Sequence, residues 1–194
     1  MSTVVATTSI DDGLRAPNAE LVRALVAMAP LLDYPTAALP TDVMICRRHI
    51  VRRWPEAADL LTPFLMWTLN EPLDVLEERY TRTFDISAVC APYAGVHIFG
   101  EESFARGELM ARLRDSFDQL GFEAGSELPD HIAVLLRFAG LLDEEALDEL
   151  IEYCLSRVVS TMAKRFATLE NPYREPISAL NLIVGDAVTH GGRS

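Results

Sequence analysis

The histidines are the side chains of this chain that could most readily bind a metal ion or transfer a proton. There are four of them, His49, His97, His131 and His190. No two have the His-Glu-x-x-His spacing that places two imidazoles on one helix face around zinc. His97 and His131 could meet in space, but the sequence offers no evident third ligand. We therefore expect no metal site and no bound cofactor.

The serine and cysteine residues do not form a catalytic pattern either. Ser103 follows Gly100-Glu-Glu, which is not the Gly-x-Ser-x-Gly turn of hydrolases, and we expect its hydroxyl to cap a helix or bond a backbone group. Gly100 and Gly107 lack the spacing of a phosphate-binding loop. The three cysteines form no Cys-x-x-Cys pair, and their odd number predicts reduced thiols. We therefore expect no catalytic residues.

Two segments combine ionisable residues with glycine or proline at the edges of predicted helices, and they cover residues 97–107 and 127–131. Pro129 in a first helical turn, with acidic residues close to the positive end of the helix dipole, is a favoured arrangement and supports a capping role. The alternative is that Asp130 and His131 face a groove and bind a partner. The sequence leaves both possibilities open.

Several further positions have an ordinary structural interpretation. Tyr80 and Phe84 are four residues apart, so their rings share a helix face and are expected in the core. Asp85 at the predicted end of that helix opposes the helix dipole, and we expect an arginine partner for it. Gly107 follows Arg106 in the first turns of another helix, where glycine costs about 1 kcal/mol relative to alanine. It either allows close helix packing or leaves room for a bound backbone.

The elements that must position these residues are helices. Apolar residues recur at spacings of three and four, whereas no two consecutive segments alternate as strands do. Thr41 or Asp42 could cap the second helix, Gly121 is expected to end the fifth, and residues 86–100 are expected to form a loop. We predict an all-α fold, a single-domain bundle of about seven to nine helices. The predicted helices cover about residues 21–32, 42–54, 55–69, 73–84, 102–120, 130–139, 143–165 and 175–188.

Composition indicates a soluble domain that does not bind nucleic acid. The chain has 194 residues, 17 basic and 29 acidic side chains, and a formal net charge of −12. We expect flexible tails at residues 1–18 and 189–194 around one domain at 19–188. No signal peptide or bilayer-spanning apolar run is evident, which favours a cytoplasmic protein with no direct membrane insertion, as a monomer or a weak homodimer. Basic residues cluster only at residues 47–53.

Three motifs and their order resemble a known family. They are Tyr80-x-x-x-Phe84-Asp85, then His97-x-Phe-Gly100-Glu101-x-Ser103-x-x-Arg106-Gly107, and finally Glu127-Leu-Pro129-Asp130-His131. This set resembles the delta-subunit family of respiratory nitrate reductase, the NarJ-type branch of the molybdoenzyme assembly chaperones. Residues 31–35, Leu-Leu-Asp-Tyr-Pro, resemble the end of the family's first helix. The resemblance covers about residues 20–170.

The resemblance implies an all-helical cytoplasmic chaperone that is not a subunit of the mature enzyme. Such proteins bind the N-terminal segment of a molybdenum-containing catalytic subunit, hold it until its cofactors are in place, and delay membrane attachment or export. The client would be a nitrate reductase, or a relative acting on chlorate, perchlorate, selenate or a hydrocarbon. The implied peptide-binding residues are Tyr80, Phe84, Asp85, His97, Gly100, Glu101, Ser103, Arg106, Gly107, Glu127, Pro129, Asp130 and His131.

Two other functions stay open at this point. A helical metal-dependent hydrolase could use His97, His131 and nearby carboxylates, and a helical scaffold could act without binding a leader peptide. If the chaperone hypothesis holds, the acidic chain should attract basic leader segments at long range. His131 could then change charge near neutral pH and make the affinity depend on pH. The loop at residues 86–96 and the arginines at 47–53 are not marks of the family.

Overall fold

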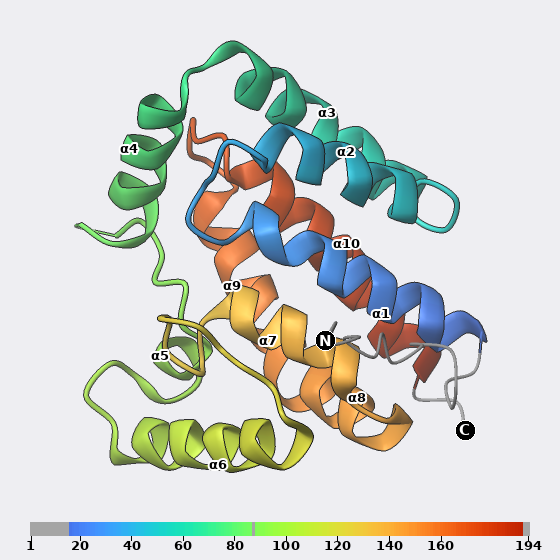
Figure 1. Cartoon of the computed structure of the whole chain (residues 1–194), viewed down its shortest axis with the longest axis vertical. Helices are drawn as coiled ribbons and strands as arrows, with labels where there is room; N and C mark the ends of the chain where they lie inside the picture. The colour runs from blue at the N-terminus through green and yellow to red at the C-terminus, as the bar shows by residue number, and fades with distance from the viewer. Residues whose placement is uncertain (1–15, 87, 192–194) are drawn as a thin grey trace, which may run out of the picture.

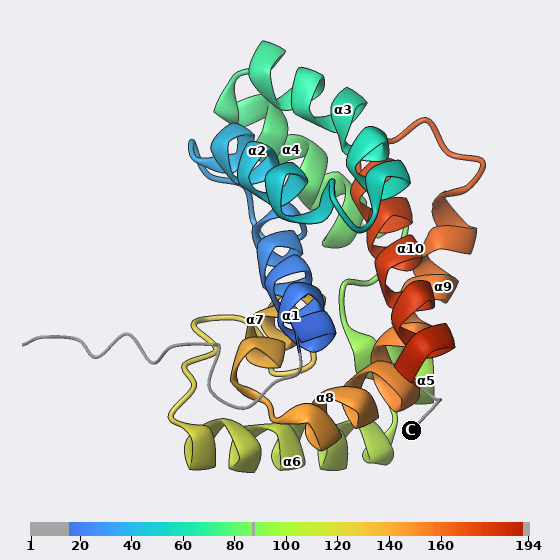
Figure 2. The same ribbon diagram turned by 90° about the vertical axis from the view of Figure 1, so that its right-hand side faces the viewer.

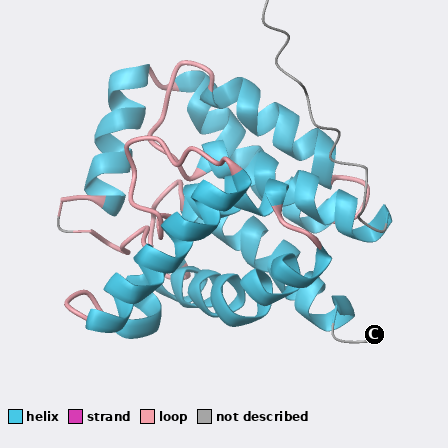
Figure 3. Ribbon diagram, turned by 60° about the horizontal axis from the view of Figure 1, so that its bottom comes forward, coloured by secondary structure: helices cyan, strands magenta, loops and turns pink. Residues whose placement is uncertain are grey.

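The computed structural model describes residues 16–86 and 88–191 of the chain. Its regular structure there is helical, with one isolated β-bridge and no strand (Figure 1, Figure 3). These residues form nine separate helices, because α8, a π-helical turn and α9 run on as one. The predicted all-α, single-domain bundle is confirmed.

The first helix ends where the sequence predicts. Helix α1 covers Ala16–Met28 and continues into a 3₁₀ turn at Ala29–Leu31 that contains Pro30. Proline lacks an amide hydrogen and clashes with the preceding turn, so regular α-helix stops there. Leu21 and Leu25, on the predicted apolar face, are buried in the core. In Figure 1 and Figure 2, α1 runs through the middle of the molecule.

The second helix begins earlier than predicted. Helix α2 covers Leu39–Ile50 and has Pro40 in its first turn. The expected cap at Thr41 or Asp42 is wrong, because both residues lie inside the helix. Proline is well suited to a first helical turn, since the amide that it lacks would have no partner inside the helix there.

Helices α3 and α10 pack against each other in one half of the molecule. Helix α3 covers Pro55–Asn70, α4 covers Leu73–Phe84, and α10 covers Arg174–Gly191. Helix α10 packs against α3 and α9, and α2 packs against α3 and α1 (Figure 2). The predicted last helix over residues 175–188 is therefore correct in place, but longer and more central than expected.

A short helix interrupts the segment that was predicted as a loop. Helix α5 covers Ala94–Phe99, and Gly100 follows it with a φ of 93°. The six residues of α5 begin with alanine and glycine, so the sequence carries little helical periodicity there. Its position is instead set by contacts with α6, α9 and the π-helical turn.

Helix α6 covers Phe104–Leu120 and ends at Gly121, whose φ of 64° matches the predicted C-terminal stop. Its apolar residues do not form one buried face. Phe117 is the only residue of α6 that is fully buried, and Phe104 is 84% exposed. Figure 1 shows α6 at the lower edge of the molecule, where it has few neighbours to cover a second face.

Helix α7 covers Ile132–Phe138 and is followed by a 3₁₀ turn at Ala139–Leu141. Every residue of α7 is buried except Arg137. The helix starts later than predicted, because His131 is its N-cap, and Pro129 lies in the turn before it. A helix buried on all sides must find partners for its terminal amides inside the protein.

The long helix near the C-terminus is confirmed. Helix α8 covers Glu144–Leu150, a π-helical turn covers Ile151–Leu155, and α9 covers Ser156–Phe166. Asp143 caps α8 by accepting a hydrogen bond from the Ala146 amide at 2.9 Å. The apolar side of this long helix lies against the core, and its buried members are Leu147, Ile151, Leu155, Val158, Val159 and Met162.

The chain ends are described only in part. Helix α1 begins at Ala16 and α10 runs to Gly191, so both helices enter the ranges expected as tails. Residues 1–15 and 192–194, and with them most of the predicted tails, lie outside the described residues. Among the helices that are described, none combines the length and the apolar character needed to cross a bilayer.

Candidate functional site

The segments before α5 and α7 lie side by side and bring two of the predicted motifs together. An isolated antiparallel bridge joins them at Tyr93 and His131. The Ala94 amide donates to the Asp130 carbonyl at 2.7 Å, which ties the start of α5 to the end of the Glu127-to-His131 motif. These contacts bring the second and third motifs close together, although 19 residues, 108–126, separate them in the sequence.

Asp130 is completely buried and its charge is neutralised by Arg106. The Arg106 guanidinium donates to it twice, from Nε to Oδ2 at 2.8 Å and from Nη2 to Oδ1 at 3.3 Å. The Gly95 amide donates to Oδ2 at 3.2 Å. The hydrogen bond to Asp130 is the main cause that raises the pKa of Arg106. This two-point pair fastens α6 to the segment before α7.

Gly95 is required for this pairing. A Cβ atom built there would lie 2.6 Å from Cγ of Arg106 and 2.8 Å from Oδ2 of Asp130. Arg106 also lies over the ring of Tyr93, with 5.3 Å between its Cζ and the ring centroid. The buried ion pair thus fits against backbone that no larger residue would allow.

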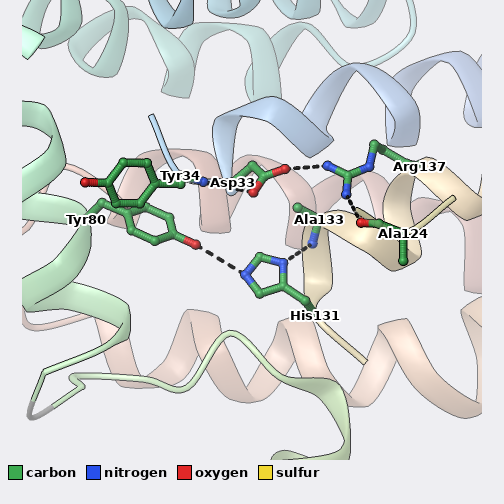
Figure 4. A network of polar contacts seen from close by, with 7 residues as sticks. All are labelled: Asp33, Tyr34, Tyr80, Ala124, His131, Ala133 and Arg137. Atoms are coloured by element: carbon green, nitrogen blue, oxygen red, sulfur yellow. Dashed lines mark hydrogen bonds and ion pairs between the residues drawn. The ribbon is translucent and has the colours of Figure 1, made fainter. Parts of the chain in front are cut away.

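His131 caps α7 and bonds Tyr80 of α4, as Figure 4 shows. Its Nδ1 accepts from the Ala133 amide at 3.2 Å, and its Nε2 lies 3.2 Å from the Tyr80 hydroxyl. Because Nδ1 accepts, the proton of the neutral ring sits on Nε2, which donates to the Tyr80 oxygen. Burial lowers the pKa of His131 to about 4, so the ring is neutral at pH 7.

These observations decide what Asp130 and His131 do in the fold. Both are buried, at 0% and 1% exposed, and their polar atoms have partners. The expectation that they face a groove is therefore wrong, and so is the expectation that His131 changes charge near neutral pH. The capping interpretation is confirmed for His131. Both residues therefore have a structural role, and Pro129 beside them is also buried.

The charges of three carboxylates from separate segments act on the Tyr80 hydroxyl. Burial is the largest cause that raises the pKa of Tyr80, and the charges of Asp33, Asp85 and Glu127 add to it. Burial, then Asp33 and Asp85, likewise raise the pKa of Glu127, while Arg137 lowers it. The three acids follow the 3₁₀ turn after α1, end α4 and precede α7, so only the fold brings them together.

The three carboxylates differ in their partners. Asp33 forms an ion pair with Arg137, which also donates to the Ala124 carbonyl at 3.2 Å (Figure 4). Asp85 and Glu127 form no ion pair with any residue in the described ranges 16–86 and 88–191. The expected arginine partner of Asp85 is therefore absent there. Two acceptor groups next to Tyr80 are left for water or for a ligand.

Each of these acids is followed in the sequence by an exposed apolar side chain. Tyr34 is 47% exposed, Ile86 is 68% exposed and Leu128 is 38% exposed. The Tyr34 ring packs edge-on against the Tyr80 ring, with 5.4 Å between centroids. Exposed apolar groups beside carboxylates are suited to a ligand that is both apolar and basic. We name this set the acid–apolar rim, and its members are Asp33, Tyr34, Asp85, Ile86, Glu127 and Leu128.

The remaining predicted residues have mostly local roles. Phe84 is buried and its ring packs against Tyr173, 5.0 Å between centroids. Nε2 of His97 donates to the Ala91 carbonyl at 2.8 Å, and burial lowers the pKa of His97. Ser103 occupies the N-cap position of α6, but its side chain makes no capping bond.

The glycines of the second motif and its acid lie at the surface. Gly107 is exposed, and a Cβ atom added there would meet nothing within 4 Å, so close helix packing does not explain this glycine. Gly100 is exposed at the end of α5. Glu101 is exposed too, and its charge is one of the causes that raise the pKa of Arg106. These residues lie near Arg106 and not near the Tyr80 hydroxyl.

The arrangement does not favour a hydrolase that uses His97 and His131. Both nitrogens of His131 are engaged, and Nε2 of His97 donates to a carbonyl. Within the described part of the chain, no three histidine, cysteine, aspartate or glutamate side chains are placed to hold a metal ion. The polar groups that stay available are carboxylates at the surface, which can bind cations.

Sequence reasoning missed Asp33, Tyr34, Ile86, Leu128 and Arg137. A signal existed for the first two, because residues 31–35 were singled out with the other motifs. Arg137 gave no signal, since its partner Asp33 lies 104 residues away. Ile86 and Leu128 gained a role only when the fold placed their acidic neighbours together.

Comparison with known proteins places the chain in a family. The model of the nitrate reductase delta subunit family matches residues 51–178, which is more than half of the chain. This protein belongs to the nitrate reductase delta subunit family. The matched range includes all three motifs but begins after Asp33 and Tyr34.

One sequence relative agrees with membership of the delta subunit family, and one solved structure shares the fold. The chain is 29% identical over 159 residues to the "Probable nitrate reductase molybdenum cofactor assembly chaperone NarJ" of Bacillus subtilis (strain 168), covering 79% of this chain and 84% of that protein. A crystal structure described as a redox enzyme maturation protein from Archaeoglobus fulgidus superposes with a TM-score of 0.56 at 18% identity. It covers 92% of this chain and 99% of that one. At that identity, the likeness supports the fold alone.

Proposed function

We propose that this delta subunit family member is an assembly chaperone for a molybdenum-containing nitrate reductase or a related oxidoreductase. It binds the N-terminal segment of the catalytic subunit at the acid–apolar rim and holds it until the cofactors are inserted. It acts in the cytoplasm, before membrane attachment or export of its client, and is not itself an enzyme. The Bacillus subtilis relative is named as a probable nitrate reductase molybdenum cofactor assembly chaperone, and this name supports the role as an assembly chaperone.

The observation that carries the proposal is a contrast between two sets of residues. One is the buried framework, which consists of Arg106, Asp130 and His131 with their internal partners, and the other is the acid–apolar rim. In the framework, Asp130 and His131 have internal partners, which leaves no nucleophile or general base free. In the rim, Asp85 and Glu127 have no cationic partner among the described residues, and Tyr34, Ile86 and Leu128 are exposed. A surface of this kind recognises a ligand through charge and apolar contact and does not transform it.

The chemistry of the rim predicts that of the bound segment. A basic side chain next to an apolar one would complement each acid and its apolar neighbour. Burial raises the pKa of both Asp85 and Glu127, and a bound cation would favour their charged forms. The net charge of −12 adds long-range attraction for a basic segment. Ordering a flexible segment costs conformational entropy, so the affinity stays moderate and release stays possible.

The experiment is an isothermal calorimetric titration of the protein with synthetic peptides from the start of a molybdoenzyme catalytic subunit. The doubly neutralised variant Asp85→Asn with Glu127→Gln should weaken binding about tenfold, as expected for one or two exposed charge contacts. The matched control, Glu149→Gln with Glu152→Gln, removes two exposed charges from the end of α8 and the π-helical turn after it, and should change binding less than twofold. Equal weakening by both variants would place the contribution of the acids in overall charge and not in the rim.

Asp130→Ala with His131→Ala is not a suitable test of the site. Asp130 neutralises a mostly buried arginine, and His131 caps a buried helix. Removing one partner of a buried ion pair costs about 3–5 kcal/mol, so this variant would lose binding through loss of structure. Substitutions in the rim avoid that ambiguity, because they leave the internal bonds intact.

A further inference from the structure

The arginine cluster at residues 47–53 divides into two parts with different surroundings. Arg47 is half-buried, and its Nε donates to the Ala58 carbonyl of α3 at 3.0 Å. Arg53 forms an ion pair with Asp186 of α10 at 3.1 Å and lies over the ring of Trp54. These two arginines hold α2 to α3 and α10. Half of the cluster therefore has a structural role.

The other two arginines face solvent. Arg48 and Arg52 are exposed, and neither forms an ion pair or side-chain hydrogen bond with a described residue. Helical spacing places Arg48 with the exposed Met44 and Ile45 on the side of α2 opposite its core-packed side, and the exposed Val51 and Arg52 follow in the turn directly after the helix. We name this face the α2 stripe, and it consists of Met44, Ile45, Arg48, Val51 and Arg52.

The composition of the α2 stripe is unusual for the solvent side of a helix. Such a side normally carries mixed charges, and the outer side of α8 and its continuation is acidic at Glu145, Glu149 and Glu152. The α2 stripe has no acidic residue and no lysine, and it combines aliphatic side chains with arginine. Methionine and arginine are enriched at protein–protein interfaces, whereas lysine, glutamate and aspartate are depleted. The stripe therefore resembles an interface more than a solvated surface.

We infer that the α2 stripe binds an acidic amphipathic helix of a protein partner. Arginine forms two-point hydrogen bonds with carboxylates, and the aliphatic residues would pack against the apolar side of the partner helix. Residues 44 to 52 extend over about 12 Å of helix axis, which corresponds to two to three turns of a partner. On a chain with a net charge of −12, this cationic face gives an acidic partner a defined place to bind.

A lipid bilayer fits the stripe less well. Each basic residue near an anionic membrane contributes about 1 kcal/mol, so two free arginines provide little against the repulsion of the acidic remainder. Three aliphatic side chains without a tryptophan or phenylalanine provide little insertion into the interface. The stripe is separate from the acid–apolar rim. The two surfaces share no residue, although Asp33 and Tyr34 of the rim lie near the first turn of α2.

The test uses the full chain and two designed peptides of the same helical pattern, one with glutamate and one with lysine beside a leucine face. The glutamate peptide should bind and shift the backbone amide resonances of residues 41–52. Arg48→Glu with Arg52→Glu should weaken this binding at least tenfold. The control, Arg112→Glu with Arg157→Glu, changes two exposed arginines elsewhere by the same charge and should weaken it less than threefold.

Other outcomes would overturn the inference. Resonance shifts outside residues 41–52, or equal weakening by both double variants, would show binding through general charge. Binding of phosphatidylglycerol vesicles that is lost in Arg48→Glu with Arg52→Glu, without binding of the glutamate peptide, would assign the stripe to lipid. The rim variant Asp85→Asn with Glu127→Gln should bind the glutamate peptide normally. Failure of the rim proposal and failure of the stripe inference are thus separately visible.

Discussion

The Nε2 atom of His131 donates to the hydroxyl oxygen of Tyr80 across 3.2 Å, and this bond joins the start of α7 to α4. Its direction is fixed because Nδ1 of the same ring accepts the Ala133 amide. Tyr80 is buried and stands among the three acids of the rim. The neutral ring of His131 thus positions both the start of α7 and the Tyr80 side chain at the candidate site.

Tyr80→Phe should destabilise the protein by about 1–3 kcal/mol, because it leaves the buried Nε2–H of His131 without an acceptor. The measurement is chemical denaturation at pH 7. Tyr34→Phe is the control, since it removes a hydroxyl from the ring packed beside Tyr80. That hydroxyl has no partner among the described residues, so its loss should change stability by less than about 0.5 kcal/mol. Equal effects of the two variants would contradict the assigned bond.

Stability should fall as the pH drops from 7 to 5. Burial lowers the pKa of His131 from 6.5 to about 4, so the unfolded chain takes up a proton that the folded chain does not. The stabilisation is complete above the unfolded pKa and is lost progressively down to the folded one. The loss between pH 7 and 5 should be about 2 kcal/mol, measured by denaturation at both values. His131→Asn keeps a helix-capping side chain and should flatten this dependence.

Gly95→Ala and Gly107→Ala should have opposite effects. The added methyl group at position 95 overlaps Arg106 and Asp130, and the strained ion pair should cost about 2–4 kcal/mol. At position 107, in an exposed part of α6 with open space around it, alanine should stabilise the helix by up to about 1 kcal/mol. Thermal unfolding of the two variants measures both changes. A stabilising alanine at position 95 would contradict the described packing.

The three thiols should react slowly while the protein is folded. Burial raises the pKa of Cys46 to about 12, of Cys90 to about 11 and of Cys154 to about 12. At pH 7 almost no thiolate forms at any of these positions, and the thiolate is the reactive species. Mass spectrometry after brief treatment with iodoacetamide should show little labelling of the native chain. The same treatment in denaturant should label all three thiols.

Local pattern was sufficient to predict most of the helices. The helix at residues 143–165 and the stop at Gly121 depend on spacing and on backbone chemistry that neighbouring residues already determine. The start of α7 was misplaced because His131 becomes a cap only when α7 is buried against the segment of Tyr93. A pattern along one chain does not contain that contact.

The candidate site was predictable only in part. Of the six rim residues, Asp85 and Glu127 were in the predicted set, whereas Asp130 and His131 were predicted to bind the ligand and are buried instead. Burial depends on which elements cover a segment, and the pairing of Asp33 with Arg137 brings together parts of the chain 104 residues apart. The apolar residues of α6 are mostly not buried for the same reason. Their spacing defines a face of the helix, but it does not supply a neighbouring element to cover that face.

Helix α6 is fastened mainly near its two ends, by Arg106 on Asp130 and by Phe117 against Val134 and Phe138. The turns between these points bury no side chain completely. They can open without breaching the main core, and their amide hydrogens should exchange with solvent well before those of α7. The molecule thus has a rigid interior and one peripheral helix whose melting would leave the rest of the protein folded.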